Sequence, residues 1–415
     1  MTKTAEQPTT HFEVIVVGGG MVGAALAALL GQAGVAVALL DARRAPLAAE
    51  AVGRGLPAMR VSALTPVSQR LLEGLGAWSW MAARRVTPYR FMQVWDGEGS
   101  GEVSFSAEQA GVPLLGHIVE NDVILAALER RLAELHTVSV QLGTRVTGLH
   151  EGTAGREVAL EDGRLLLAPL VVAADGAHSP LRESAGITVQ AQDTGHVAVV
   201  TTVHTECNHG GVARQVFLAT GPLAFLPLTV AGDERYCSIV WSTSPEEAAR
   251  LTALTPEALG RELESAFEAR LGAVEVVDRA LAVPLTQRHA EHYVQTGFAL
   301  VGDAAHSIHP LAGQGVNLGL MDAAVLAEEL LVARRRGIPL GELRMLERYS
   351  RRRRGDNAAM LALMDGFRLL FGARHPALTL LRNLGLSGVD RLTPVKRVIM
   401  QQAIGQRGTL PTSCR

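Results

Sequence analysis

Apolar runs bounded by glycines open the chain and predict a buried βαβ unit. Residues 11–17 form a short β-branched run, residues 21–32 are rich in Ala and Leu as in a helix, and residues 35–40 form a second β-branched run. Residues 14–40 contain no charge, which is also typical of a membrane span. We favour the βαβ unit, because glycines interrupt the run at turn positions and parallel strands buried on both faces are equally apolar.

Further along, helical and extended patterns alternate. The spacing of apolar residues predicts helices over 67–75, 122–135, 245–271 and 317–335, and one buried strand over 165–174. Alternating patterns predict antiparallel strands over 91–105, 197–203, 213–218, 223–228 and 236–241. This order predicts an α/β fold with α+β insertions, in which a Rossmann-like dinucleotide-binding domain is interrupted by an antiparallel-sheet domain and followed by a helical C-terminus.

We divide the chain accordingly. The dinucleotide-binding domain takes residues 1–75, 111–185 and 285–370; the sheet domain takes 76–110 and 186–284; the helical C-terminal segment takes 371–415. A chain of 415 residues exceeds a single typical core, which agrees with two lobes.

Composition narrows the class of protein. The net charge of −2 and the aromatic content of 4% argue against nucleic acid as a partner. Three widely spaced cysteines, Cys207, Cys237 and Cys414, fit neither a disulfide framework nor a zinc site. With a polar N-terminus that lacks a signal-peptide core, these features predict a cytoplasmic protein.

The first candidate site is residues 18–23 (GGGMVG), a G-x-G-x-x-G that follows a strand and opens a helix. The first glycine makes a tight turn, the second lets the backbone approach a pyrophosphate, and the third allows close helix–strand packing. An acid ends the next strand 18 residues later, where it can bind a ribose. The expected dinucleotide-binding residues are Gly18, Gly20, Met21, Val22, Gly23 and Asp41.

Two further loops follow predicted strands. Residues 175–182 (DGAHSPLR) are either a second cofactor loop or a solvated turn capped by Asp175 and Ser179. Residues 302–317 place an acid, Asp303, at a strand end and then a Gly-rich stretch at a helix N-terminus, whose free N–H groups and dipole favour negative charge. His306 and His309 could suggest a metal site, but no carboxylates are arranged to complete it, so no metal is expected. We interpret His306 as a structural hydrogen-bonding residue.

These three loops, in this order, resemble the single-component flavin hydroxylases related to para-hydroxybenzoate hydroxylase. Within that superfamily the chain is most similar to the bacterial ubiquinone-biosynthesis hydroxylases (UbiH, UbiF and UbiI), from residue 12 to about 405. The most specific segments are 59–64 (MRVSAL), 116–121 (GHIVEN), 237–242 (CSIVWS) and 302–322. The segments 94–96 (VWD), 212–217 (VARQVF) and 244–247 (SPEE) resemble the UbiI (VisC) branch.

The resemblance implies FAD as cofactor and NAD(P)H as co-substrate. It places Asp303 at the ribityl hydroxyls, Asp175 between the flavin pyrophosphate and the nicotinamide path, and the 313–317 loop at the flavin pyrimidine edge. It adds to the cofactor-binding residues Arg60, Asp175, Gly176, Gly302, Asp303, Pro310, Gly313, Gly315, Val316 and Asn317. Many relatives in the superfamily have an Arg at the position of Asn121, which leaves the adenosine contacts open. No catalytic side chain is identified; the residues expected nearest the flavin are Pro310, Gly313, Gln314 and Gly315.

The implied function is an FAD-dependent monooxygenase of ubiquinone biosynthesis. It would use NAD(P)H and O₂, through a flavin C4a-hydroperoxide, to hydroxylate the ring of a hydrophobic polyprenylphenol at the UbiI-type position. Alternatives are another ring position of the same pathway, or an oxygen-independent flavin oxidoreductase of the same fold. The remaining alternative is a scaffold protein without enzymatic activity.

Residues 377–404 are amphipathic and net basic. Such a segment suits a membrane surface, here the inner face of the plasma membrane, or a docking site on a complex of the same pathway. In that case a protein cut at Pro376 stays folded and FAD-loaded. The alternative is that the same leucines pack on the FAD domain. The sequence leaves homo-oligomerisation open.

Overall fold

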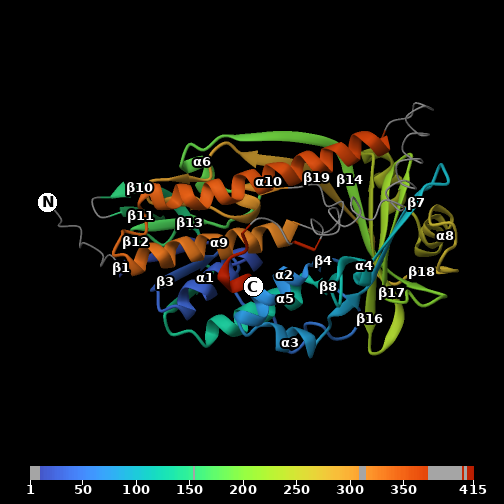
Figure 1. Ribbon diagram of the computed structural model, residues 1–415, viewed down its shortest axis with the longest axis horizontal. Coiled ribbons are helices and arrows are strands. Elements are labelled where there is room, and N and C mark those ends of the chain that lie inside the picture. Colours follow the sequence, from blue (N-terminus) through green and yellow to red (C-terminus); the bar gives the residue numbers. More distant parts are fainter. Residues whose placement is uncertain (1–9, 153–154, 308–314, 373–403, 406–408) are drawn as a thin grey trace.

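The computed structural model describes residues 10–152, 155–307, 315–372, 404–405 and 409–415 (Figure 1). An α/β lobe and a lobe dominated by one large sheet lie along the long axis of the molecule. The α/β fold expected from the sequence is confirmed.

A six-stranded sheet forms the centre of the α/β lobe, in the order β20-β21-β13-β2-β3-β9. Its strands are β2 (Val14–Val17), β3 (Val37–Asp41), β9 (Val138–Leu142), β13 (Leu170–Ala173), β21 (Phe298–Leu300) and β20 (Val294–Gln295). All neighbours pair in parallel except β20 with β21. The long helices of this lobe are α1 (Met21–Gln32), α5 (Asn121–Ala133), α9 (Gly315–Arg335) and α10 (Leu343–Gly372).

The uncharged run at the start of the chain is the βαβ unit β2–α1–β3, as predicted. All four residues of β2 are buried, and α1 buries eight residues. No helix within the described part of the chain is long and apolar enough to cross a membrane.

A nine-stranded sheet forms the second lobe, in the order β22-β19-β14-β17-β16-β15-β6-β7, with β18 added beside β14. Its longest strands are β14 (Val189–Thr205), β16 (Gly221–Val230), β17 (Asp233–Thr243) and β19 (Leu281–Ala290). The others are β6 (Phe91–Asp96), β7 (Glu102–Ser106), β15 (Val212–Leu218), β18 (Val274–Val276) and β22 (His306–Ser307). β22 lies within the predicted third loop (302–317), so this sheet reaches the cofactor end of the α/β lobe.

Two small sheets complete the fold. β4 (Val61–Leu64), β8 (Gly116–Glu120) and β5 (Thr87–Tyr89) form one; β1 (Thr10–His11), β12 (Leu165–Ala168), β11 (Gly155–Leu160) and β10 (Val146–Gly152) form the other. The short helices are α2 (Pro66–Gly74), α3 (Trp78–Ala82), α4 (Ala107–Ala110), α6 (Pro180–Ser184), α7 (Pro245–Thr252), α8 (Pro256–Ala266), η1 (Gly302–Ala304) and η2 (Thr412–Cys414).

Three predicted elements are divided in the structure. The strand expected over 11–17 is β1 and β2, which belong to different sheets. The single strand over 165–174 is two strands, because Pro169, which has no N–H to donate, separates β12 from β13, and these belong to different sheets. The single helix over 245–271 is α7 and α8. The break falls before Pro256, where the side chain of Thr255 accepts a hydrogen bond from the N–H of Ala258 and starts a new helix.

Candidate cofactor and substrate site

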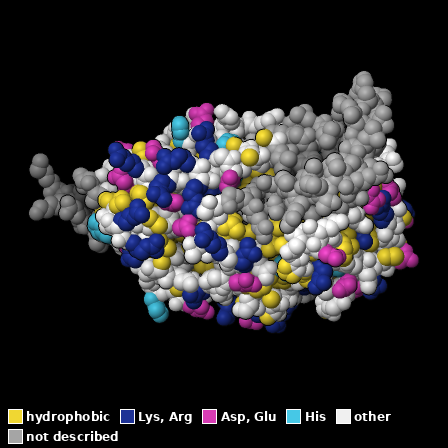
Figure 2. All heavy atoms as spheres, in the orientation of Figure 1, with side chains coloured by type: hydrophobic (Ala, Val, Ile, Leu, Met, Phe, Trp, Pro, Cys, Tyr) yellow, Lys and Arg dark blue, Asp and Glu magenta, His cyan; other side chains and the backbone are white. Residues whose placement is uncertain are grey.

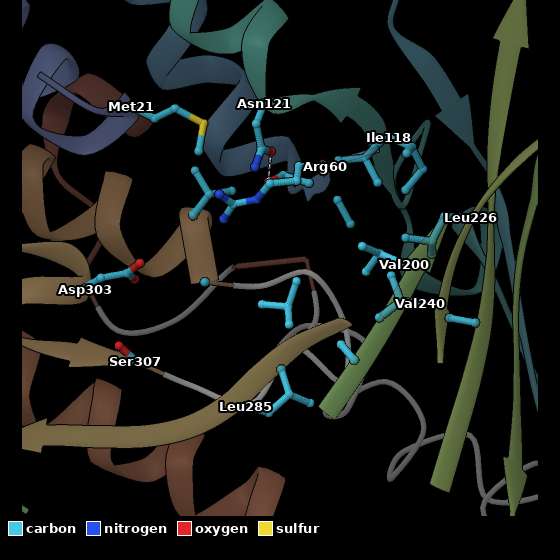
Figure 3. Close-up of a pocket in the computed structure, with 18 of the residues that line it drawn as sticks. Met21, Arg60, Ile118, Asn121, Val200, Leu226, Val240, Leu285, Asp303 and Ser307 are labelled. Atoms are coloured by element: carbon cyan, nitrogen blue, oxygen red, sulfur yellow. Dashed lines mark hydrogen bonds between the residues drawn. The ribbon is translucent and has the colours of Figure 1, made fainter. Parts of the chain in front are cut away.

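One cavity of about 830 Å³ lies between the two lobes. One of its ends is formed by the loops that follow β2, β13 and β21, which is where open parallel sheets bind nucleotides. The other end is formed by the nine-stranded sheet. Figure 3 shows Met21, Arg60 and Asp303 around the first end and Leu226, Val240 and Val200 at the second.

The glycines of the first loop have the local geometry that the motif predicts. Gly18 has a φ of +105°, and a Cβ there would lie 2.2 Å from the carbonyl oxygen of Ala174. A Cβ on Gly23 would lie 1.9 Å from the carbonyl oxygen of Gly18, so α1 packs directly on the turn. A Cβ on Gly20 would meet no atom within 4 Å, and this residue lines the cavity with Met21 and Val22. No side chain caps the start of α1, so its first N–H groups remain available to a phosphate.

Asp41 stabilises this loop. Its Oδ2 accepts a hydrogen bond of 2.7 Å from the N–H of Gly19, and its Oδ1 accepts one of 2.7 Å from the N–H of Arg43. The Arg43 guanidinium in turn pairs with Glu129 at 2.8 Å. Asp41 is not among the residues that line the cavity, so its contact with a ribose stays a prediction. Its hydrogen bond to the glycine loop is present in the structure.

Asp303 and Arg60 face the cavity from different elements. Asp303 lies in η1 at the end of β21, and Arg60 immediately precedes β4. The Asp303 side chain is open to the cavity but otherwise enclosed by protein. Burial raises the pKa of its carboxyl, and the nearby His306 and Arg60 only partly offset this. Within the described residues this carboxyl has no hydrogen-bond partner, so it is free to accept from hydroxyls of a ligand.

The second loop contributes backbone to the cavity. Gly176 lines it, and a Cβ there would meet no atom within 4 Å. Asp175 instead points to the start of α6, where its Oδ2 accepts from the N–H of Leu181 at 3.2 Å and Ser179 caps the helix. Burial raises the pKa of Asp175, and its Oδ1 is buried without a partner among the described residues. The capped turn is therefore present, and a cofactor role for Asp175 stays a prediction.

The third loop is described in part. Gly302 adopts a φ of +59°, and Gly315 and Val316 line the cavity, with open space where a Cβ on Gly315 would lie. The Asn317 side chain bonds to other parts of the protein and does not line the cavity. Its amide donates to the carbonyl oxygen of Ala63 at 2.7 Å and accepts from Ser68 at 2.7 Å, so a contact with a cofactor falls to its backbone. Pro310, Gly313 and Gln314 lie outside the described residues.

A buried polar cluster behind this loop was not foreseen from the sequence. The Asp322 carboxylate accepts from the N–H of Gly302 at 3.1 Å, lies 2.5 Å from Nε2 of His306, and pairs with Arg353 at 2.7 Å. Burial opposes ionisation of Asp322, but His306 and Arg353 outweigh it and lower its pKa to about 2. The hydrogen-bonding role predicted for His306 is confirmed. Arg353 belongs to a run of four arginines (351–354), and its pairing with Asp322 was not expected from the sequence.

The end of the cavity away from the glycine loops is mainly apolar. Strands β14 to β17 and the three-stranded sheet supply most of its wall. The residues lining it include Ala63, Tyr89, Met92, Phe105, Leu115, Ile118, Ala198, Val200, Ala213, Arg214, Gln215, Ala224, Leu226 and Val240. Such a surface suits a hydrophobic aromatic molecule and keeps water from the cofactor end.

The described end of the C-terminal segment packs on the core, which favours the alternative that this segment is structural. The behaviour of a protein cut at Pro376 stays a prediction. Ile404 is 2% exposed and lines the cavity. Cys414 is fully buried, and its carbonyl oxygen accepts from Arg70 at 2.9 Å. The backbone N–H and side chain of Thr412 both bond to Glu328. Most of residues 377–404 lies outside the described residues, so its membrane role stays a prediction.

These residues fit FAD. Gly20, Gly176 and Gly315 leave open space where the backbone meets the cavity, α1 offers uncapped N–H groups for a pyrophosphate, and the Asp303 carboxyl is free for ribityl hydroxyls. No group of three or more metal-ligating side chains occurs among the described residues. A flavin dinucleotide is therefore the ligand that this end of the cavity suits.

Comparison with known proteins agrees with this assignment. The family described as FAD binding domain matches residues 11–363. The 3-demethoxyubiquinol 3-hydroxylase of Escherichia coli (strain K12) is 40% identical over 96% of this chain and 99% of its own length. The ubiquinone hydroxylase UbiL of Rhodospirillum rubrum is 38% identical over 95% of this chain and 89% of its own. Among solved structures, p-nitrophenol 4-monooxygenase PnpA of Pseudomonas putida DLL-E4 superposes with a TM-score of 0.77 at 22% identity, covering 97% of this chain and all of that one.

Fold and site together define an FAD-dependent monooxygenase, with NAD(P)H as the reductant typical of the class. The chain belongs to the family of ubiquinone-biosynthesis hydroxylases that includes UbiH, UbiF and UbiI. The resemblance to the UbiI branch in particular is not confirmed, since a 3-demethoxyubiquinol 3-hydroxylase is 40% identical over almost the whole chain.

Proposed function

We propose that this protein hydroxylates the aromatic ring of a polyprenylated phenol or quinol in ubiquinone biosynthesis. The observation that carries the proposal is the single cavity that joins the glycine loops at residues 18–23 to an apolar wall on the nine-stranded sheet. This arrangement would put a hydrophobic ring beside the flavin. The relatives named as ubiquinone-pathway hydroxylases support the same substrate class.

The bound flavin would supply the oxidation chemistry, taking electrons from NAD(P)H and passing one atom of O₂ to the ring. The chain's own residues would bind, orient and exclude water. Asp303 would hold the ribityl chain, the N-terminus of α9 would favour negative charge on the ring system, and the apolar wall would keep the reacting centre dry. An electron-rich ring needs little help from an acid or base, which agrees with the lack of an evident catalytic side chain among the described residues.

The intermediate that accumulates without the enzyme identifies the ring position that the enzyme hydroxylates. The test is profiling of quinone intermediates by mass spectrometry after deletion of the gene, with the same gene on a plasmid as control. We expect ubiquinone to fall and one prenylated intermediate lacking a single ring oxygen to accumulate, with reversal by the plasmid. An unchanged quinone profile would contradict the proposal.

A further inference from the structure

Two of the polar residues in the mainly apolar wall of the cavity, which Arg214 and Thr286 also line, are Tyr89 and Gln215. Tyr89 ends β5 and Gln215 lies in β15, and both line the cavity. Tyr89 is 9% exposed and Gln215 is 8% exposed. Across the described ranges of the chain, neither side chain has a hydrogen-bond partner, and their polar atoms are not sealed away from the cavity.

The surroundings of Gln215 are apolar. In the sheet it pairs with Ala224, Ala224 pairs with Val240, and Val240 pairs with Val200. All four residues line the cavity, so a row of three small or branched apolar side chains leads to one amide. Such a row offers a hydrocarbon surface that ends in a hydrogen-bonding group.

Tyr89 belongs to the same region. It packs in a cluster with Ala63, Ile118 and Ala213. Ala213 precedes Gln215 by two residues in β15, and residues two apart lie on one face of a strand. Ile118 stands between Arg60 and Leu226 in Figure 3, between the cofactor end and the apolar end. Tyr89 and Gln215 therefore border the part of the cavity that an aromatic ring next to the flavin would fill.

A buried hydroxyl or amide without a partner costs free energy, so native proteins keep such groups paired. Where an unpaired group faces a cavity, a ligand atom is the natural partner. Burial raises the pKa of Tyr89 to about 12, so its hydroxyl stays protonated and able to donate across the physiological range. The Gln215 amide can donate and accept.

We propose that the Tyr89 hydroxyl and the Gln215 amide hydrogen-bond the ring oxygens of the substrate, and so select a ring that already carries oxygen substituents. The inference rests on the proposed function and deepens it. The substrate class is a prenylated phenol or quinol with at least two ring oxygens, whose tail lies on the apolar wall.

The test compares Tyr89→Phe and Gln215→Leu, which remove the polar groups at nearly constant volume. Tyr236→Phe is the matched control, because Tyr236 is a tyrosine in β17 of the same lobe that does not line the cavity. The probes are an alkylated quinol and the matching alkylated phenol that lacks one ring oxygen. FAD content of each variant checks that the protein is folded.

We expect each cavity variant to lower kcat/KM for the quinol by about 10- to 100-fold, because each leaves one ring oxygen unpaired. The phenol keeps only one ring oxygen, so the variant that removes the partner of the missing oxygen should change kcat/KM for the phenol far less. Tyr236→Phe should keep the wild-type ratio between the two probes. A quinol-to-phenol ratio that stays at the wild-type value in both cavity variants would overturn the inference.

Failure of the proposed function has a different signature. In that case the wild-type protein hydroxylates neither probe. Binding of the two probes, followed by quenching of flavin fluorescence, would then still test the inference. A wild-type preference for the quinol that Tyr89→Phe and Gln215→Leu abolish would support the two contacts, and a preference that survives in both would refute them.

Discussion

Nε2 of His306 lies 2.5 Å from Oδ2 of Asp322, and this contact ties β22 to the middle of α9 behind the cofactor loop. The same carboxylate accepts from the N–H of Gly302, the residue before Asp303. Arg353 of α10 pairs with its second oxygen. One buried acid therefore connects α9 and α10 to residues on both sides of Asp303.

The pH dependence of stability should reveal this cluster. The folded-state pKa of Asp322, about 2, lies below its usual value of about 3.9. Its contribution is therefore fully present above pH ~4 and is lost as pH falls toward 2. Asp322→Asn should lower the free energy of unfolding at neutral pH by about 3–5 kcal/mol and flatten its fall between pH 4 and 2. Urea unfolding across this range measures both, and a variant with the wild-type slope and stability would contradict the role.

Removing the Asp303 carboxyl should affect the cofactor and spare the fold. Within the described residues this group makes no hydrogen bond to protein, so little native structure depends on it. We expect Asp303→Ala to lose most of its FAD or its activity while the circular dichroism spectrum stays native. Asp303→Asn, which keeps the shape and one acceptor, should lose less. A yellow, fully active Asp303→Ala protein would show that the role is wrong.

Substitutions at two glycines of the first loop should have different effects. A Cβ on Gly20 meets no protein atom within 4 Å, whereas a Cβ on Gly23 lies 1.9 Å from a backbone oxygen. Gly20→Val should therefore give a folded protein without FAD, because the side chain fills the space expected for the pyrophosphate. Gly23→Ala should instead lower the melting temperature. Flavin absorbance and thermal unfolding separate the two, and stoichiometric FAD in Gly20→Val would refute the contact.

The sequence predicted those parts of the site that depend on local geometry. The roles of Gly18 and Gly23 follow from a turn and a helix within six residues, and the structure shows both close approaches. The Asp322–Arg353 pair joins residues 31 apart in two different helices, and the run of arginines at 351–354 does not by itself indicate which side chain pairs with Asp322. The split at Pro169 was missed because the apolar run continues on both sides of the proline. Tyr89 and Gln215 lie in different sheets, and both line one cavity because of how these sheets pack, which the alternating pattern does not determine.

Deleting residues 409–415 should destabilise the protein. The deletion exposes the protein surface that covers Cys414. It also removes the carbonyl oxygen that accepts from Arg70 and the N–H of Thr412 that donates to Glu328. We expect a loss of about 2–5 kcal/mol in the free energy of unfolding. Thr412→Ala, which removes one side-chain hydrogen bond, is the graded control and should cost about 1 kcal/mol. A truncated protein with wild-type stability would show that this tail is not structural.

The most direct measurement of the central claim follows the oxygen atom. Purified FAD-loaded protein is supplied with NAD(P)H, ¹⁸O₂ and a prenylated phenol or quinol, and the product is analysed by mass spectrometry. A monooxygenase of this kind should oxidise NAD(P)H faster when the substrate is present and place one ¹⁸O atom on the ring. Oxidation of NAD(P)H at the same rate with and without substrate, and a ring that gains no ¹⁸O, would contradict the account and favour an oxygen-independent oxidoreductase.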